Sequence, residues 1–227
     1  HDNMNINKKE TKEFFFILLI PLIFLLVMWI VKLVEIQFNL SFVKFGIYPK
    51  DINSLSGILF SPFIHKDFSH LFNNSYPILI LSSLLFLAYR SIALQIFIWL
   101  FFISGFWLWI IGRESYHIGA SGMIYSLAAF LFVSGLIRKN PRLAALSMII
   151  IFLYGSLIWG VFPLKSGVSW EGHLAGLFAG LITAIFYKNE GPKPKKYQWE
   201  IDEELEKRVE TENEIKINYI ITKQKKP

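Results

Sequence analysis

The chain has 227 residues, of which 54% are hydrophobic and 17% aromatic, and its mean hydropathy is +0.45. Charged residues fall almost entirely in short stretches between long apolar runs, a pattern typical of membrane spans and not of a soluble domain. The net charge of +6 comes from basic residues that flank these runs without stacking aromatics, which argues against a nucleic-acid partner. The lack of cysteine excludes disulfides, thiolate metal sites and a cysteine nucleophile.

Six apolar segments are each long enough to predict a membrane-spanning helix. In chain order they cover about residues 14–31, 70–88, 91–111, 121–137, 143–162 and 173–187. The stretch between the first two, about 35–69, mixes aromatic and charged residues, and its length predicts a functional loop at the membrane interface. We therefore expect an all-α membrane protein: a six-transmembrane-helix bundle with a long first external loop.

The distribution of basic residues predicts the orientation of this bundle. Six spans place both chain ends on one side, and the basic loop 138–142 would lie on that side too. The positive-inside tendency assigns this side to the cytosol. We expect a cytosolic N-terminus at 1–13, a membrane domain at 14–187 and a charged cytosolic tail at 188–227. The predicted location is the plasma membrane, or the inner membrane of a bacterium.

Four polar side chains stand at the ends of these apolar segments, where burial in hydrocarbon is costly unless the group has a partner or a function. His70 and Asn74 open the second segment, Ser121 opens the fourth, and His173 opens the sixth. All three segments run from outside to inside in the expected orientation. The four groups are therefore expected at one depth, near the external surface.

The combination of residue types favours acyl transfer. A serine needs an adjacent base to act as a nucleophile, and a neutral imidazole can supply it. Free N–H groups at a helix N-terminus stabilise an oxyanion. Small residues at 172, 176, 180 and 184 form a ridge that lets another helix approach closely, with Gly122 and Ser126 facing it. Each feature alone is more often structural: a helix cap, a hydrogen-bond partner or a packing contact.

Two other chemistries fit the residues less well. His65, Asp67 and His70 are of metal-ligand type, but no fourth ligand and no His-Glu-x-x-His helix accompanies them, so we expect no metal and no cofactor. An aspartyl mechanism needs carboxylates within the spans, and the six expected segments contain neither Asp nor Glu. Serine chemistry remains.

At these positions the sequence resembles the rhomboid family of intramembrane serine proteases, over about residues 14–187. Residues 119–122 match the family's Gly-x-Ser-x element, residues 70–74 its His-x-x-x-Asn element, and residues 173–176 its histidine followed by small residues. The order and spacing of these elements agree with the family. The Trp-Arg pair often found in the family's first external loop is absent between Glu35 and Ser69.

The resemblance implies a serine endopeptidase that cleaves transmembrane segments of single-pass partner proteins near the external side. It implies Ser121 as the nucleophile and His173 as the general base, with Tyr125 packed under the base. The oxyanion would be held by the backbone N–H of Ser121 and by the side chains of His70 and Asn74, and Gly119 would let the loop backbone approach the substrate. The implied surroundings are membrane lipid, without cofactor or nucleic acid.

Two competing functions predict different sequences. A non-catalytic rhomboid-like protein that binds transmembrane clients would be expected to lack the serine or the histidine, and both are present. A small transporter would be expected to have broken helices or a polar path reaching the cytosolic side. The segments are instead apolar below their outer third.

Overall fold

The computed structural model describes residues 2–139, 141, 144–145, 148–149, 152, 162, 169–191 and 198–224. The chain divides into two compact units, residues 1–192 and residues 193–227. The second unit contains helix α9 (Gln198–Gln224), whose exposed surface carries an ion pair of 2.6 Å between Lys207 Nζ and Glu203 Oε1. The first unit holds all the candidate site residues.

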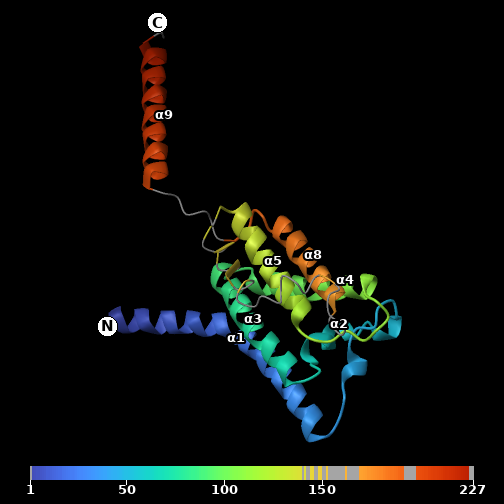
Figure 1. Ribbon diagram of the computed structural model, residues 1–227. Coiled ribbons are helices and arrows are strands. Elements are labelled where there is room, and N and C mark those ends of the chain that lie inside the picture. Colours follow the sequence, from blue (N-terminus) through green and yellow to red (C-terminus); the bar gives the residue numbers. More distant parts are fainter. Residues whose placement is uncertain are drawn as a thin grey trace. The chain divides into compact units, whose positions relative to one another are not determined.

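Regular structure in the described part of the first unit is helical, apart from a single β-bridge between Ile47 and His117. The α-helices, shown in Figure 1, are α1 (Asp2–Gln37), α2 (Gly57–Phe60), α3 (Phe68–Ala88), α4 (Ala93–Ile111), α5 (Ser121–Ile137) and α8 (Trp170–Phe186). Three short 3-10 turns, Val43–Phe45, Ile52–Ser54 and Ser61–Phe63, structure the segment between α1 and α3.

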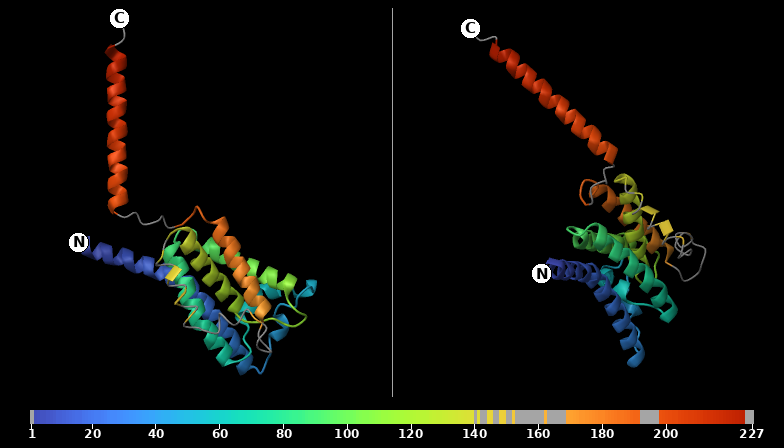
Figure 2. Two further views of the ribbon diagram at one scale, coloured as in Figure 1. Left: turned by 45° about the horizontal axis from the view of Figure 1, so that its top comes forward. Right: turned by 90° about the vertical axis from the view of Figure 1, so that its left-hand side faces the viewer.

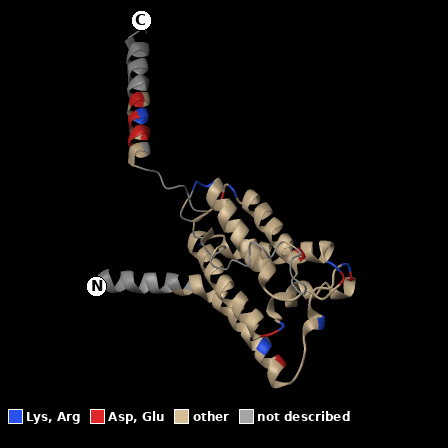
Figure 3. Ribbon diagram, in the orientation of Figure 1, with Lys and Arg blue, Asp and Glu red and all other residues tan. Residues whose placement is uncertain are grey.

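Among the residues that the structure describes, three helices are long and apolar enough to cross a membrane: Ile17–Gln37 within α1, α3, and α4. Helices α5 and α8 are apolar but shorter. Figure 3 shows that the described charged residues of the first unit lie at helix ends and in loops. The expectation of an all-α membrane protein is confirmed, whereas the count of six spans stays a prediction. The fifth expected segment, 143–162, lies almost wholly outside the described residues.

Two helices extend beyond the predicted apolar segments. Helix α1 continues to Gln37, and α8 begins at Trp170, so Glu35 and Glu171 lie within helices although both are outside the segments 14–31 and 173–187. Each carboxylate has a cationic partner, Lys32 for Glu35 and Arg113 for Glu171. This pairing offsets the cost of burying a charge, which allows the helices to extend past the apolar runs.

The core lies between α3, α4 and α5. Its large, fully buried side chains are aliphatic or aromatic and come from all three helices: Leu71, Ile78, Leu81, Leu85, Ile96, Leu100, Leu127 and Phe130. Large apolar side chains also remain exposed on the outer faces, for example Phe102 and Phe106 of α4. Exposed apolar surface of this kind is expected where lipid is the solvent.

Helices α5 and α8 run side by side in every view (Figures 1 and 2) and approach to backbone contact. A Cβ atom added at Gly176 would overlap the carbonyl oxygen of Gly122, and one added at Gly180 would overlap that of Ser126. Glycine is therefore required at both positions of α8. The small-residue ridge predicted for this helix does face residues 122 and 126.

A polar cluster joins α3, α5 and α8 at the end of α5 opposite Ser121. The hydroxyl of Tyr89 lies 2.5 Å from that of Ser134, and Arg138 Nη2 donates to the Tyr187 carbonyl at 2.6 Å. The guanidinium of Arg138 also lies over the Tyr89 ring, 5.6 Å from its centroid. These bonds fasten the ends of three helices together and satisfy groups that would otherwise be buried without partners.

Candidate active site

Ser121 is the first residue of α5, and its partly exposed side chain borders a small, partly open cavity of about 30 Å³. The cavity wall also includes Gly119, Gly122, His117 and Ser169. The loop 112–120 and the starts of two helices thus meet at one hollow. A serine in this position is accessible and has the free N–H groups of a helix N-terminus beside it.

Gly119 brings the serine loop against His70. Its φ of +104° lies in the left-handed region, which disfavours any other residue. A Cβ atom at this position would lie 2.7 Å from Nε2 and 2.6 Å from Cε1 of His70. The imidazole of His70 therefore rests directly on the backbone two residues before Ser121, and only glycine leaves room for it.

Asn74 lies one turn after His70 on the same face of α3. Its buried side-chain amide donates to the His70 carbonyl oxygen at 2.7 Å. This bond fixes the amide against the backbone of His70. The two side chains predicted as oxyanion donors are thus neighbours, and His70 is the one that contacts the serine loop.

His173 stacks on Tyr125. The two ring centroids are 4.2 Å apart and the rings are inclined by only 14°. Both residues are buried, His173 in the first turns of α8 and Tyr125 one turn after Ser121 in α5. The stack fixes the plane of the imidazole ring.

The residues adjoining the serine and the histidine also contact each other. A Cβ atom at Gly122 would lie 3.3 Å from the carbonyl oxygen of Gly172. Since Gly122 follows Ser121 and Gly172 precedes His173, the two helices meet at the candidate dyad. The structure thus gathers Gly119, Ser121, Tyr125, His70 and His173 around one helix junction, while their chemical roles stay predictions.

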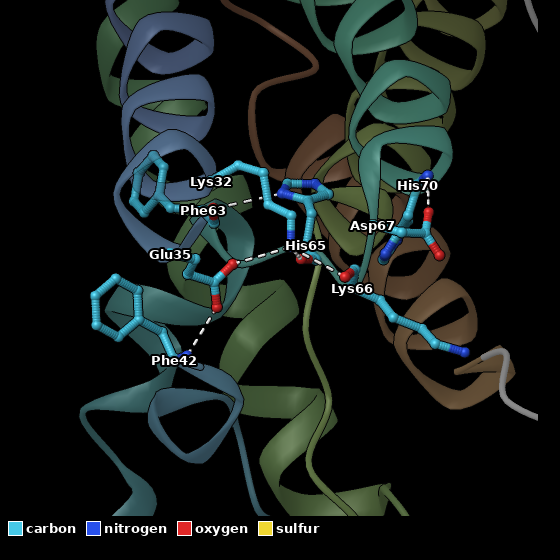
Figure 4. Close-up of polar contacts among 8 residues, drawn as sticks. All are labelled: Lys32, Glu35, Phe42, Phe63, His65, Lys66, Asp67 and His70. Atoms are coloured by element: carbon cyan, nitrogen blue, oxygen red, sulfur yellow. Dashed lines mark hydrogen bonds and ion pairs between the residues drawn. The ribbon is translucent and has the colours of Figure 1, made fainter. Parts of the chain in front are cut away.

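A buried lysine anchors the segment that leads to His70 (Figure 4). Lys32 Nζ, at the end of α1, donates to Glu35 Oε2 at 3.2 Å and to the carbonyl oxygens of His65 and Lys66 at 2.9 and 3.0 Å. Glu35 Oε1 accepts the N–H of Phe42 at 2.7 Å. This anchor was missed from the sequence, where its only signal is an oppositely charged i, i+3 pair closing an apolar run.

Asp67 caps the N-terminus of α3. Its carboxylate accepts the N–H of His70 at 2.8 Å, and this hydrogen bond holds the pKa of the Asp67 carboxyl below its usual range. The cap sets where α3 starts, and therefore which residues face the serine loop. Figure 4 shows Asp67 and His70 joined in this way beside the Lys32 anchor.

His65 is buried against this anchor. Its ring packs edge to face against that of His70, with centroids 4.9 Å apart. Its Nδ1 lies 3.4 Å from the carbonyl oxygen of Phe63, and since a carbonyl only accepts, Nδ1 carries the proton. Nε2 has no hydrogen-bond partner among the residues that the structure describes. Burial, together with the charges of His70 and Lys32, lowers the pKa of His65 to about 3. His65 is therefore neutral in the folded protein.

This neutral histidine makes the folded state sensitive to acid. His65 takes up a proton near pH 6.5 in the unfolded state but only near pH 3 in the folded state. Its contribution to the unfolding free energy is therefore fully present above about pH 6.5 and is lost as the pH drops towards 3. Between pH 6.5 and 4.5 we expect this group alone to remove about 2–3 kcal/mol of unfolding free energy. Unfolding by SDS at a series of pH values measures the loss. His65→Gln is expected to flatten the profile, and an unchanged slope would refute this role.

Sequence reasoning assigned no site role to His117 or Ser169. The structure places both on the cavity wall with Ser121, and His117 Nδ1 lies 2.6 Å from Ser169 Oγ. The two residues are 52 positions apart, each four residues ahead of a member of the candidate dyad. No local pattern marks such a pair, and the sole hint is their constant offset from Ser121 and His173.

The fold and the site together define a helical membrane protein with a serine at the rim of a small cavity. The rhomboid domain pattern matches residues 53–190, and the chain belongs to the rhomboid family, a family of intramembrane serine proteases. Similar curated proteins include uncharacterized protein Mb1372 of Mycobacterium bovis and uncharacterized protein Rv1337 of Mycobacterium tuberculosis. Each is 32% identical over 176 residues, which is 72% of this chain and 72% of the relative. Uncharacterized protein ML1171 of Mycobacterium leprae is 34% identical over 175 residues, covering 72% and 68%.

Proposed function

We propose that this protein is an intramembrane serine endopeptidase that cleaves transmembrane segments of single-pass partner proteins near the external side of the membrane. The observation that carries the proposal is the stacked His173–Tyr125 pair, packed at backbone contact against the helix whose first residue, Ser121, borders an open cavity. A partly exposed serine and an imidazole of fixed orientation thus lie at one helix junction, beside a cavity that opens to the surface.

In this mechanism His173 takes the proton of the Ser121 hydroxyl as Oγ attacks the scissile carbonyl carbon. The tetrahedral oxyanion is stabilised by the Ser121 N–H and by the side chains of His70 and Asn74. His173 then protonates the leaving amine, and water hydrolyses the acyl-enzyme by the same route. Tyr125 holds the imidazole ring in place of the orienting aspartate of soluble serine proteases.

The same reasoning sets the substrate. A peptide bond within a transmembrane helix must leave helical geometry before attack, so small or helix-weakening residues near the cleaved bond are the expected preference. With six spans and both ends cytosolic, the start of α5 and its serine face the outside. Water would then reach Ser121 through the mouth of the cavity.

Labelling with a serine-directed fluorophosphonate tests the proposal on the purified full chain in lipid bicelles. The wild type is expected to be labelled, Ser121→Ala not at all, and His173→Ala far more slowly. Ser126→Ala is the matched control, since Ser126 lies in the same helix but is buried and bonded to the Met123 carbonyl; it should label like the wild type. Label that persists in Ser121→Ala would refute the assignment. A wild type that neither labels nor cleaves transmembrane substrates would point to a client-binding protein.

A further inference from the structure

Two polar links outside the candidate dyad join the serine loop to the helix that carries the histidine. The first is the hydrogen bond of 2.6 Å between His117 Nδ1 and Ser169 Oγ. On the other side of the ring, Nε2 lies 3.0 Å from the carbonyl oxygen of Arg113. Since a carbonyl only accepts, Nε2 carries the proton, Nδ1 is the acceptor, and the Ser169 hydroxyl donates to it.

The same Ser169 oxygen caps α8. Its Oγ accepts a hydrogen bond of 3.2 Å from the N–H of Gly172, and Gly172 is the residue immediately before His173. One hydroxyl therefore both caps the N-terminus of α8 and links this helix to His117. His117 is in turn fixed to the first loop, because its N–H and carbonyl both pair with Ile47, at 2.8 and 3.0 Å.

The second link is an ion pair. Arg113 Nη1 lies 3.4 Å from Oε1 of Glu171, and the side chain of Glu171 is 4% exposed. A buried carboxylate needs a cationic partner, and this one comes from the same loop as His117. Both links thus connect residues 113–117 with residues 169–171.

Both links lie close to the candidate dyad of Ser121 and His173. His117 precedes Ser121 by four residues, Ser169 precedes His173 by four, and both side chains line the cavity beside Ser121. Burial lowers the pKa of His117, and this keeps the imidazole in the neutral form that accepts from Ser169. A change at either link would shift the loop of the nucleophile relative to the helix of the base.

We propose that the His117–Ser169 hydrogen bond, supported by the Arg113–Glu171 ion pair, is a positioning device that sets the geometry between Ser121 and His173. The proposal rests on the proposed protease function. His117 and Ser169 are positioning residues, and they act through the dyad without touching the reacting atoms. Misplacement of a catalytic group by about 1 Å can cost about 100-fold in rate, so the links should be visible in kinetics.

The test measures fluorophosphonate labelling of Ser121 in the full chain, well below its unfolding temperature. Ser169→Ala and His117→Leu are expected to slow labelling by about 10- to 100-fold and to lower kcat for a transmembrane substrate with KM unchanged. Ser169→Thr keeps the hydroxyl, and His117→Asn places an acceptor oxygen near the position of Nδ1. Both should label within about threefold of the wild type, since the link is retained.

The double variant Ser169→Ala/His117→Leu separates positioning through one bond from two independent effects. If the residues act through their hydrogen bond, the double variant should label no more slowly than the slower single variant. Multiplied losses, or unchanged labelling in folded single variants, would overturn the inference. If either single variant fails to fold, Arg113→Gln against Arg113→Lys tests the second link in the same assay. A wild type that itself neither labels nor cleaves defeats the proposed function instead.

Discussion

His173→Ala is expected to cleave a transmembrane substrate at least about 10⁴-fold more slowly than the wild type. Without the imidazole no base takes the proton of Ser121, and no acid protonates the leaving amine. Single-turnover cleavage in lipid vesicles measures the chemical step, because excess enzyme removes the contribution of product release. The loss should appear in the single-turnover rate constant.

Tyr125 supplies the control for this prediction, since it contacts the base without taking part in proton transfer. Tyr125→Phe keeps the ring that stacks on His173 at 4.2 Å, and it should cleave at close to the wild-type rate. Tyr125→Ala removes the stack and is expected to slow cleavage by about 10- to 100-fold, because the base is no longer oriented. If His173→Ala retains more activity than Tyr125→Ala, His173 is not the general base.

Lys32→Met is expected to lower the free energy of unfolding by about 3–5 kcal/mol, the usual cost of removing one partner from a buried ion pair. The ammonium group of Lys32 uses all three of its N–H donors, on Glu35 and on two backbone carbonyls. Its loss leaves a carboxylate and both carbonyls buried without that partner. Equilibrium unfolding in SDS measures the change.

Two further variants show whether the loss of stability comes from leaving a buried charge unpaired. Lys32→Met/Glu35→Gln removes both charges and should recover part of the lost stability, since no unpaired carboxylate remains. Lys207→Met breaks an exposed lysine–glutamate pair of α9 and should leave stability unchanged, because solvent screens such pairs. Equal destabilisation by Lys32→Met and Lys207→Met would contradict the anchoring role of Lys32.

The apolar helices could be predicted closely because their limits coincide with changes in hydropathy. Helix α5 runs from Ser121 to Ile137 as expected, and α3 and α4 differ from the prediction by two residues at one end each. Asp67 directly precedes α3, Gly112 directly follows α4, and Arg138 directly follows α5. Helices α1 and α8 were harder to delimit, since Glu35 and Glu171 continue them where the sequence shows a charge and therefore an apparent end.

The candidate site was predictable where a few residues carry a local pattern, as in the Gly-x-Ser-x element at 119–122 and in the pair His70 and Asn74. The hydrogen bonds and ion pairs that hold these residues in place could not be predicted. The carbonyl partners of Lys32 lie 33 and 34 residues away, and backbone carbonyls have no sequence signature. The partners of His117 and Arg113 come from the start of α8, and only the folded chain brings them to the serine loop.

The glycine contacts between α5 and α8 also limit the route by which a peptide can arrive. An extended strand needs a gap of about 5 Å on each side, whereas these helices already touch through backbone atoms at Gly122 and Gly176. Parting them would break the His173–Tyr125 stack and move the base away from the serine. The backbones of α5 and α8 therefore leave no gap between them, and a transmembrane substrate of the proposed protease would have to enter along a different edge of the bundle.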